Sequence, residues 1–378
     1  MAKGHEYAVL DIGSHKMRLL VANKCYSTFS VKAEAQVAYD GYANGKWVNE
    51  DSVRNAIKEV VAKVKGKDAK IKKLYVGVPA EFCTHKVVSA SIQSIKRKKV
   101  EQSDVDALFI TGNPFGDDKT LLVKAPEYFM VDNSKNRYIN ALGLPTQSLS
   151  GSLCYIATEN NFVAFINDVL KRCQINETVF LCSTYSEMLS LFDEKSRQYG
   201  VLLVDCGYRS TSVSIMNGDG IIFLCSFSIG QMHLIKWIAQ GLQIPYEVAA
   251  KLFQKVDLSL NSSSEATYSV EAEGGMMRFS CSKIIEMVSQ CISVICNYVN
   301  KSLEKFNDYK ITRLTINITG DGLRLRGIEA CMGSKLGRSV KTVVPMKNSN
   351  YNNAEYSRAV GLIEQALDMD SKKTSWIW

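Results

Sequence analysis

The sequence has few of the features that mark a membrane, secreted or metal-binding protein. No run of about 18 apolar residues is present, so no membrane-spanning helix is expected. The first residues contain no apolar signal core. The 4 histidines are scattered and none of the 11 cysteines forms a CxxC pair, which argues against a metal site and a disulfide framework. We therefore expect a protein of a reducing compartment, the cytoplasm.

Basic residues are concentrated rather than uniform. The net charge is +8, and lysines and arginines cluster within residues 63–73 and 96–99. Such clusters bind nucleic acid, anionic lipid or an acidic partner, or form a solvated surface. No zinc-finger spacing, RNA-binding signature or aromatic stacking motif accompanies them, so no nucleic-acid partner is expected.

Length and periodicity predict an α/β protein with more than one compact unit. The 378 residues, 46% of them hydrophobic, exceed the size of one small domain. Apolar spacing predicts a long helix over 281–305 and three consecutive strands over 200–230. Residues 80–158 predict short strands with one helix, 101–111, capped by Ser103. This pattern of elements differs from that of the flanking segments, which indicates an insertion.

An internal duplication is the most informative pattern. An apolar strand ends in Asp11-Ile12-Gly13, and a polar turn leads to a second strand near Met17. Far downstream, another apolar strand ends in Asp205-Cys206-Gly207, and a turn leads to a strand from Thr211. The repeat predicts two similar hairpins, one in each half of the chain.

The duplicated turns have the chemistry of a nucleotide clamp. Glycine at a hairpin tip lets backbone N–H groups approach a phosphate without an intervening Cβ. Asp11 and Asp205, each at the end of a strand, can face Mg²⁺ through its water ligands. A third strand runs into the glycine turn Gly320-Asp321-Gly322, which would pack on the adenine and ribose.

With these residues in place, the chain resembles the actin-like superfamily and, within it, the FtsA family. The closing segment 357–362 resembles the last helix of that family. The residues that the resemblance and the clamp assign to nucleotide binding are Asp11, Gly13, Ser14, His15, Lys16, Asp205, Gly207, Tyr208, Arg209, Ser210, Thr211, Glu247, Lys251, Gly320, Asp321 and Gly322. Of these, Asp11 and Asp205 are the expected Mg²⁺ residues, acting through water.

The inserted region carries the specific part of the resemblance. Residues 74–79, a helix with Val105 and Leu108, and the segments 126–132 and 142–144 follow one another as in the subdomain characteristic of FtsA. The implied fold is two-lobed, with duplicated ribonuclease-H-like domains. The implied parts are a first lobe core (1–73 and 159–177), the inserted subdomain (74–158), a second lobe core (178–232 and 306–369), its subdomain (233–305) and a tail (370–378).

The resemblance also implies a function. FtsA proteins bind ATP between two lobes, assemble end to end into filaments, and link the tubulin-like FtsZ and other division proteins to the membrane. We therefore expect a bacterial division scaffold that is cytoplasmic or peripheral on the cytoplasmic face of the membrane, with ATP and Mg²⁺ as cofactors.

The second phosphate loop departs from the family pattern Asp-x-Gly-Gly-Gly-Thr. Tyr208 and Arg209 stand where two glycines are usual. Side chains there would crowd the γ-phosphate, which needs close backbone approach. Arg209 would either supply a cation to the phosphates or point into solvent.

Other candidate site residues also depart from the family pattern. Glu247 and Lys251 lie one turn from the expected register and would also suit a surface i,i+4 pair. Asp321 replaces a usual glycine. Glu187 is the one acidic candidate for a hydrolytic base near the expected place, with a structural role as the alternative. We expect at most a weak ATPase.

The last residues suit a bilayer interface. Trp376 and Trp378 flank Ile377, and Lys372 and Lys373 precede them; Trp settles at headgroup depth and Lys reaches anionic lipid. The segment is too short for a stable helix alone, so membrane contact would need the avidity of a filament. A frayed end or a partner-binding peptide is the alternative.

Two other kinds of actin-like protein are alternatives. A PilM-like assembly protein of a pilus or secretion system shares the inserted subdomain and grips a short peptide from a membrane protein. A sugar kinase or polyphosphate-type phosphatase would need a catalytic Asp or Glu beyond Asp11 and an insertion elsewhere.

Overall fold

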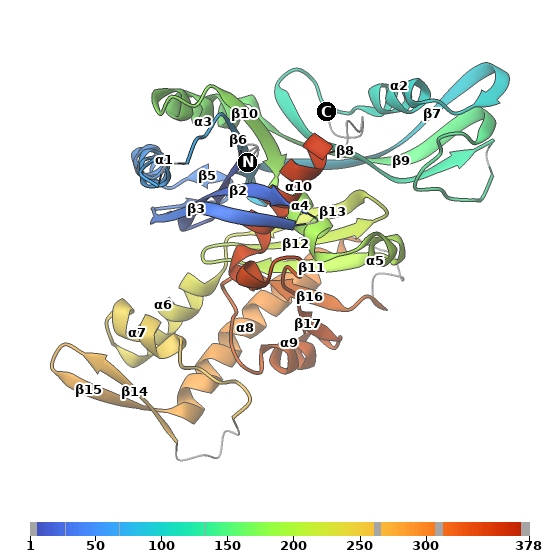
Figure 1. Ribbon diagram of the computed structural model, residues 1–378. Coiled ribbons are helices and arrows are strands. Elements are labelled where there is room, and N and C mark those ends of the chain that lie inside the picture. Colours follow the sequence, from blue (N-terminus) through green and yellow to red (C-terminus); the bar gives the residue numbers. More distant parts are fainter. Residues whose placement is uncertain are drawn as a thin grey trace. The chain divides into compact units, whose positions relative to one another are not determined.

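The computed structural model describes residues 6–26, 28–67, 69–132, 134–260, 266–306 and 313–371. The chain divides into two compact units (Figure 1). The first unit comprises Met1–Val201, Ser214–Cys225 and Val344–Trp378, and the second comprises Leu202–Val213 and Ser226–Val343. The predicted tail residues Lys372, Lys373, Trp376, Ile377 and Trp378 lie outside the described residues. No helix in the described part is long and apolar enough to span a bilayer.

The first unit contains a mixed five-stranded sheet of order β10-β6-β1-β2-β3. Its strands are β1 (Glu6–Ile12), β2 (Lys16–Cys25), β3 (Thr28–Ala38), β6 (Lys73–Val78) and β10 (Glu177–Cys182). Strand β1 is antiparallel to β2 and parallel to β6. Almost every residue of β1 and β6 is buried, which is why both strands are continuous apolar runs without alternation.

Helices pack around this sheet, and α1 and α3 do so with an apolar face. The helices are α1 (Glu50–Lys65), α3 (Asn160–Arg172), α4 (Ser183–Leu191) and α10 (Ser357–Ser371), and the short polar helix α5 (Glu194–Tyr199) follows α4 in the chain. The Asn49 side chain caps α1 by accepting from the Asp51 and Ser52 backbone N–H groups. On α10, Leu362 and Ile363 pack in one cluster with residues of β1 and β2.

The inserted subdomain belongs to the first unit. A short hairpin, β4 (Tyr42–Ala43) and β5 (Lys46–Trp47), precedes it in the chain, and the turn η1 (Ala80–Phe82) opens it. Its strands are β7 (Cys83–Lys99), β8 (Lys119–Val131) and β9 (Pro145–Glu159), in the order β7-β9-β8, with α2 (Gln102–Gly112) as its helix. Leu108 and Phe109 of α2 share one core with Phe129 and Leu153 of the sheet.

Two expectations about this subdomain were wrong. Its strands are long, with 17, 13 and 15 residues, because serines that alternate with apolar residues along β9 occupy one face of a continuous strand. The helix begins at Gln102 and its N-cap is Glu101, not Ser103. The Asp104 carboxylate accepts from the Glu101 N–H at 2.9 Å, so a reciprocal capping pair leaves Ser103 inside the first turn.

A second five-stranded sheet repeats the topology of the first. Its order is β13-β12-β11-β16-β17. Its strands are β11 (Val201–Cys206), β12 (Thr211–Asn217), β13 (Gly220–Phe227), β16 (Ile316–Thr319) and β17 (Val340–Thr342). Strand β11 is parallel to β16, as β1 is to β6, and β16 is parallel to β17, as β6 is to β10. The predicted duplication and the three strands over 200–230 are therefore confirmed.

The rest of the second unit is mostly helical. Its helices are α6 (Gln231–Leu242), α7 (Tyr246–Phe253), α8 (Cys281–Glu304) and α9 (Ile328–Leu336), and its hairpin is β14 (Thr267–Ala272) with β15 (Gly275–Ser280). The long helix expected over 281–305 is α8, whose buried face includes Ile284, Val288, Ile292 and Ile295. That spacing of three and four residues is what made the helix predictable.

Candidate functional site

The first predicted phosphate loop is a tight hairpin tip between β1 and β2. The Gly13 N–H donates to the Lys16 carbonyl at 2.9 Å. A Cβ on Gly13 would lie 2.8 Å from that carbonyl oxygen and 3.7 Å from Nη2 of Arg358. The hydroxyl of Tyr39 donates to the Gly13 carbonyl at 2.6 Å. The turn thus requires glycine, is braced by a phenol, and has a guanidinium beside it.

Asp11 is the most informative side chain of this loop. It is only 4% exposed, and its Oδ1 has no hydrogen-bond partner among the described residues. A buried carboxylate oxygen without a partner is unfavourable, and the water shell of a Mg²⁺ ion would satisfy it. Ser14 is buried, while His15 and Lys16 are half-buried. These residues fit a magnesium-bound phosphate group.

The second predicted loop repeats the backbone turn of the first. The Gly207 N–H donates to the Ser210 carbonyl at 2.8 Å, three residues on, as Gly13 does to Lys16. Asp205 is 6% exposed, at the end of β11 as Asp11 is near the end of β1. Thr211 is buried and its hydroxyl donates to the Ile229 carbonyl at 2.7 Å. The sequence repeat is therefore also a repeat of local geometry.

The two residues that replace family glycines interact with side chains of α6 and α7. The Tyr208 hydroxyl lies 2.6 Å from the Tyr246 hydroxyl at the start of α7. Burial, with the hydrogen bond to Tyr208, raises the pKa of Tyr246, and the charge of Arg209 opposes that rise. Burial also lowers the pKa of His233 on α6, and the charges of Lys236 and Arg209 add to the lowering. Arg209 therefore adds positive charge to the environment of both side chains.

The predicted adenosine motif packs directly on the second loop. The Gly322 N–H donates to the Cys206 carbonyl at 2.7 Å. Gly320 has φ +91°, and a Cβ there would overlap Oδ1 of Asp205 and the Cys206 carbonyl. The Asp321 carbonyl accepts from the Gln231 side chain at 3.4 Å. The structure thus brings the motif, the second loop and the start of α6 into one cluster.

The two charged residues of α7 do not join this cluster through described contacts. Glu247 is exposed. Lys251 is exposed and its Nζ donates to the Glu271 carbonyl on β14 at 3.2 Å. Their own helix turns its apolar face inward, with Val248, Leu252 and Phe253 buried. This contact directs Lys251 toward the β14–β15 hairpin.

Glu187 lies in the contact between α4 and α10. It is fully buried, and its Oε1 accepts from the Ser357 hydroxyl at 2.5 Å. A second hydrogen bond joins α4 to α10, in which the neighbouring Ser186 hydroxyl donates to Oε1 of Gln365. Gly361 sits at the same crossing, where an added Cβ would meet the Ser186 backbone. The partners of Glu187 are those of a helix-packing residue.

Comparisons with known proteins agree with this geometry. The family model "Cell division protein FtsA" matches residues 202–361. The Cell division protein FtsA of Streptococcus pneumoniae is 21% identical over 97% of this chain and 81% of its own. Among solved structures, a PilM–PilN type IV pilus biogenesis complex has a TM-score of 0.66 at 14% identity, covering 97% of this chain and 99% of its own. MreB5 of Spiroplasma citri bound to AMPPNP has a TM-score of 0.58 at 12% identity, covering 98% of each chain.

The chain is similar to FtsA proteins, by the family model over residues 202–361 and by a curated relative along nearly its whole length. Its fold is the actin-like one, as the duplicated sheets and the solved structures agree. The predicted fold class and the predicted resemblance to FtsA are therefore confirmed.

Several residues that contact the two loops were not among the predicted site residues. Tyr39 and Arg358 meet the first loop, and Tyr246 meets the second. Gly230 is a further one, since a Cβ there would overlap the Gly207 carbonyl. Among these, Gly230 had a usable signal, because a glycine directly before a predicted helix often marks a close backbone approach.

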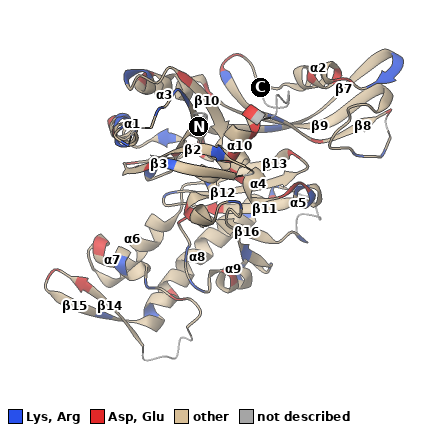
Figure 2. Ribbon diagram, viewed as in Figure 1, with Lys and Arg blue, Asp and Glu red and all other residues tan. Residues whose placement is uncertain are grey.

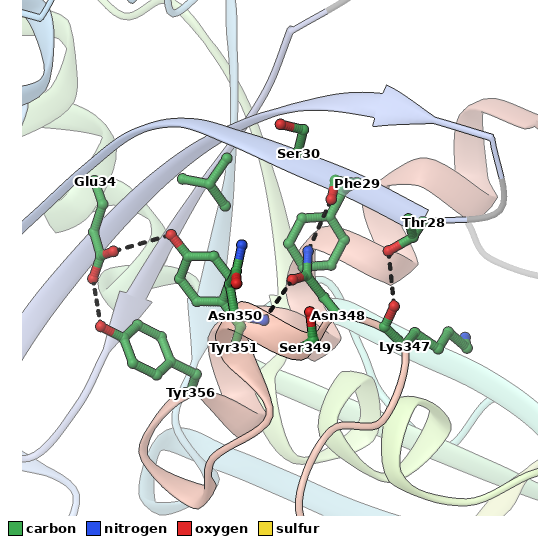
Figure 3. A pocket seen from close by; sticks show the side chains of 11 residues that line it. Thr28, Phe29, Ser30, Glu34, Lys347, Asn348, Ser349, Asn350, Tyr351 and Tyr356 are labelled. Carbon is green, nitrogen blue, oxygen red and sulfur yellow. Dashed lines mark hydrogen bonds between the residues drawn. The ribbon is translucent and has the colours of Figure 1, made fainter.

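The first unit of this FtsA-type chain also has a groove that the predicted site does not use (Figure 3). Its volume is about 410 Å³. It is lined by Thr28, Phe29, Ser30, Val31, Glu34, Lys347, Asn348, Ser349, Asn350, Tyr351 and Tyr356. Glu34 accepts from the Tyr351 and Tyr356 hydroxyls at 3.2 and 2.8 Å, and the Asn348 amide donates to the Phe29 carbonyl at 2.8 Å. These bonds fix the segment before α10 against the edge strand β3.

Proposed function

We propose that the protein is an FtsA-type cell-division scaffold whose assembly is controlled by bound ATP and Mg²⁺. One observation carries the proposal: the same glycine turn, with a buried aspartate two residues before the glycine, occurs at Gly13 and at Gly207. A phosphate-binding turn needs its glycine for close approach and its aspartate for a hydrated cation. An ordinary hairpin needs neither a buried carboxylate nor its repetition in a second sheet.

The residues around each turn have distinct roles in this proposal. At the first turn, the backbone N–H groups of residues 14–16 and the side chain of Lys16 bind phosphate, and Arg358 adds positive charge. At the second, Arg209 supplies a cation where the family has glycine. The Gly320–Gly322 segment, packed on Cys206, receives the adenosine part. Asp11 and Asp205 would each hold water ligands of a bound Mg²⁺, which would neutralise phosphate charge.

The test of this function is nucleotide-dependent assembly of the purified full-length protein. Sedimentation and light scattering would be followed without nucleotide, with ADP and with ATP, each with and without Mg²⁺. We expect saturable ATP binding and assembly that needs both ATP and Mg²⁺. Assembly that is indifferent to nucleotide would contradict nucleotide control. Co-sedimentation with an FtsZ-type protein of the same cell would then test the division role against a PilM-like role, which the shared fold also permits.

We further propose that Glu187 is structural and that hydrolysis is weak or absent. Glu187→Gln keeps an acceptor for the Ser357 hydroxyl, so basal ATP turnover should not change, whereas loss of a true general base lowers turnover by roughly 10²–10⁴-fold. Glu187→Ala leaves a buried hydroxyl and a cavity, and should lower the free energy of unfolding by about 2–4 kcal/mol. Phosphate release and thermal unfolding measure the two effects. A large loss of turnover in the Gln variant would instead identify the base.

A further inference from the structure

Strand β7 carries an extruded segment at its outer end. Gln93 pairs with Ser148 of β9, and the next pair along is Lys98 with Thr146. Residues 94–97 therefore face Gln147 alone, and most of them must leave the plane of the sheet. Figure 2 shows the outer end of β7 in blue, the colour of lysine and arginine.

The extruded segment combines one aliphatic side chain with consecutive cations. Ile95 is 96% exposed, and every residue from Lys96 to Lys99 is exposed. We call residues Ile95–Lys99 the β7 tip. A fully exposed Ile at the apex of a bulge contributes nothing to the subdomain core, against which Val88, Ala90 and Ile92 of the same strand pack.

Two of the four basic residues of the tip form ion pairs within the subdomain, and the other two can face a binding partner. Arg97 pairs with Asp132 at 3.0 Å and donates to the Pro145 carbonyl at 3.3 Å. Lys98 pairs with Asp104 at 2.7 Å. Lys96 and Lys99 form no ion pair with any residue that the structure describes. The nearby β8–β9 connection adds Lys135 and Arg137, both exposed, so positive charge predominates around Ile95.

We propose that the β7 tip docks on an anionic lipid surface, with Ile95 entering the interface and Lys96 and Lys99 facing lipid phosphates. An aliphatic group among flexible lysines is suited to a fluid, negatively charged surface, where each basic residue near the surface raises affinity roughly fivefold. A protein partner would instead need a shaped pocket and a buried anchor, and the tip is a convex bulge. This membrane contact is independent of nucleotide and of the C-terminal tail.

The experiment measures vesicle binding by the full-length protein carrying Trp376→Ser and Trp378→Ser, so that the tail contributes little. The probes are vesicles of phosphatidylcholine alone and of phosphatidylcholine mixed with phosphatidylglycerol. We expect binding to the mixed vesicles only. Lys96→Glu with Lys99→Glu should weaken that binding at least tenfold, as roughly fivefold per lost cation implies. Ile95→Ser should weaken it several-fold.

Matched controls separate the tip from general charge and general exposure. Lys58→Glu with Lys171→Glu makes the same change of net charge on exposed residues of α1 and α3. Ile110→Ser removes another exposed isoleucine, 76% exposed on α2. Both controls should bind like the parent. Equal losses in tip and control variants, or no loss in the tip variants, would overturn the proposal. So would capture of a polyglutamate peptide by the tip without any vesicle binding, which would assign the tip to an acidic protein.

Discussion

Replacing Asp11 by Asn should strongly weaken Mg²⁺-dependent ATP binding without damaging the fold. Asp11 is buried and its Oδ1 has no hydrogen-bond partner among the described residues, so the fold loses no described bond to that oxygen when the charge is removed. The hydrated cation, by contrast, loses a negative charge that orients its waters. A fluorescent ATP analogue titrated with and without Mg²⁺ should show roughly a hundredfold weaker binding in the variant.

The control for this variant is Asp40→Asn. Asp40 is an exposed aspartate of the first unit, and its replacement makes the same change of net charge. It should bind nucleotide like the wild type, and both variants should unfold at the wild-type temperature. If Asp11→Asn binds ATP normally, the first loop is not the magnesium site. If neither variant nor the wild type binds at millimolar nucleotide, Tyr208 and Arg209 have closed the site, and the protein is an actin-shaped scaffold without nucleotide.

The hairpins were predictable because their signals are local. The N–H groups of Gly13 and Gly207 each donate to a carbonyl three residues further on, so each turn can be recognised from a short stretch of sequence. The long helix α8 was predictable for a similar reason, since its apolar stripe repeats over 24 residues. The repeat of Asp and Gly at strand ends then linked two local signals into one fold.

The environment of each loop was not predictable because it depends on distant residues. The hydroxyl of Tyr39 reaches Gly13 across 26 positions, and that of Tyr208 reaches Tyr246 across 38. Arg358 reaches the first loop from the last helix of the described chain. No periodicity or spacing rule specifies such contacts. The sequence therefore left the direction of Tyr208 and Arg209 open, and the bond from Tyr208 to α7 appears only in three dimensions.

Gly361→Ala should destabilise the first unit strongly, although alanine is the better helix former. A Cβ at position 361 would lie 2.6 Å from the carbonyl carbon and oxygen of Ser186 and 2.7 Å from the nitrogen of Glu187. These are backbone atoms of α4 and cannot rotate away, so α10 must shift and disturb the bond between Ser357 and Glu187. We expect the free energy of unfolding to fall by about 2–3 kcal/mol because overpacking outweighs the gain of roughly 1 kcal/mol in helix propensity.

Thermal unfolding measures this effect, with Gly66→Ala as the matched control. Gly66 ends α1 with φ −64°, and a Cβ there would meet only the Ala62 carbonyl at 3.5 Å and that of Lys63 at 3.7 Å, so its Tm should stay the same or rise slightly. Gly361→Ala should lower the Tm by roughly 5–10 °C. Equal Tm values for both variants would mean that α10 can move away from α4 at little cost. The crossing would then be a compliant contact, and the burial of Glu187 beneath it would not depend on how closely the two helices approach.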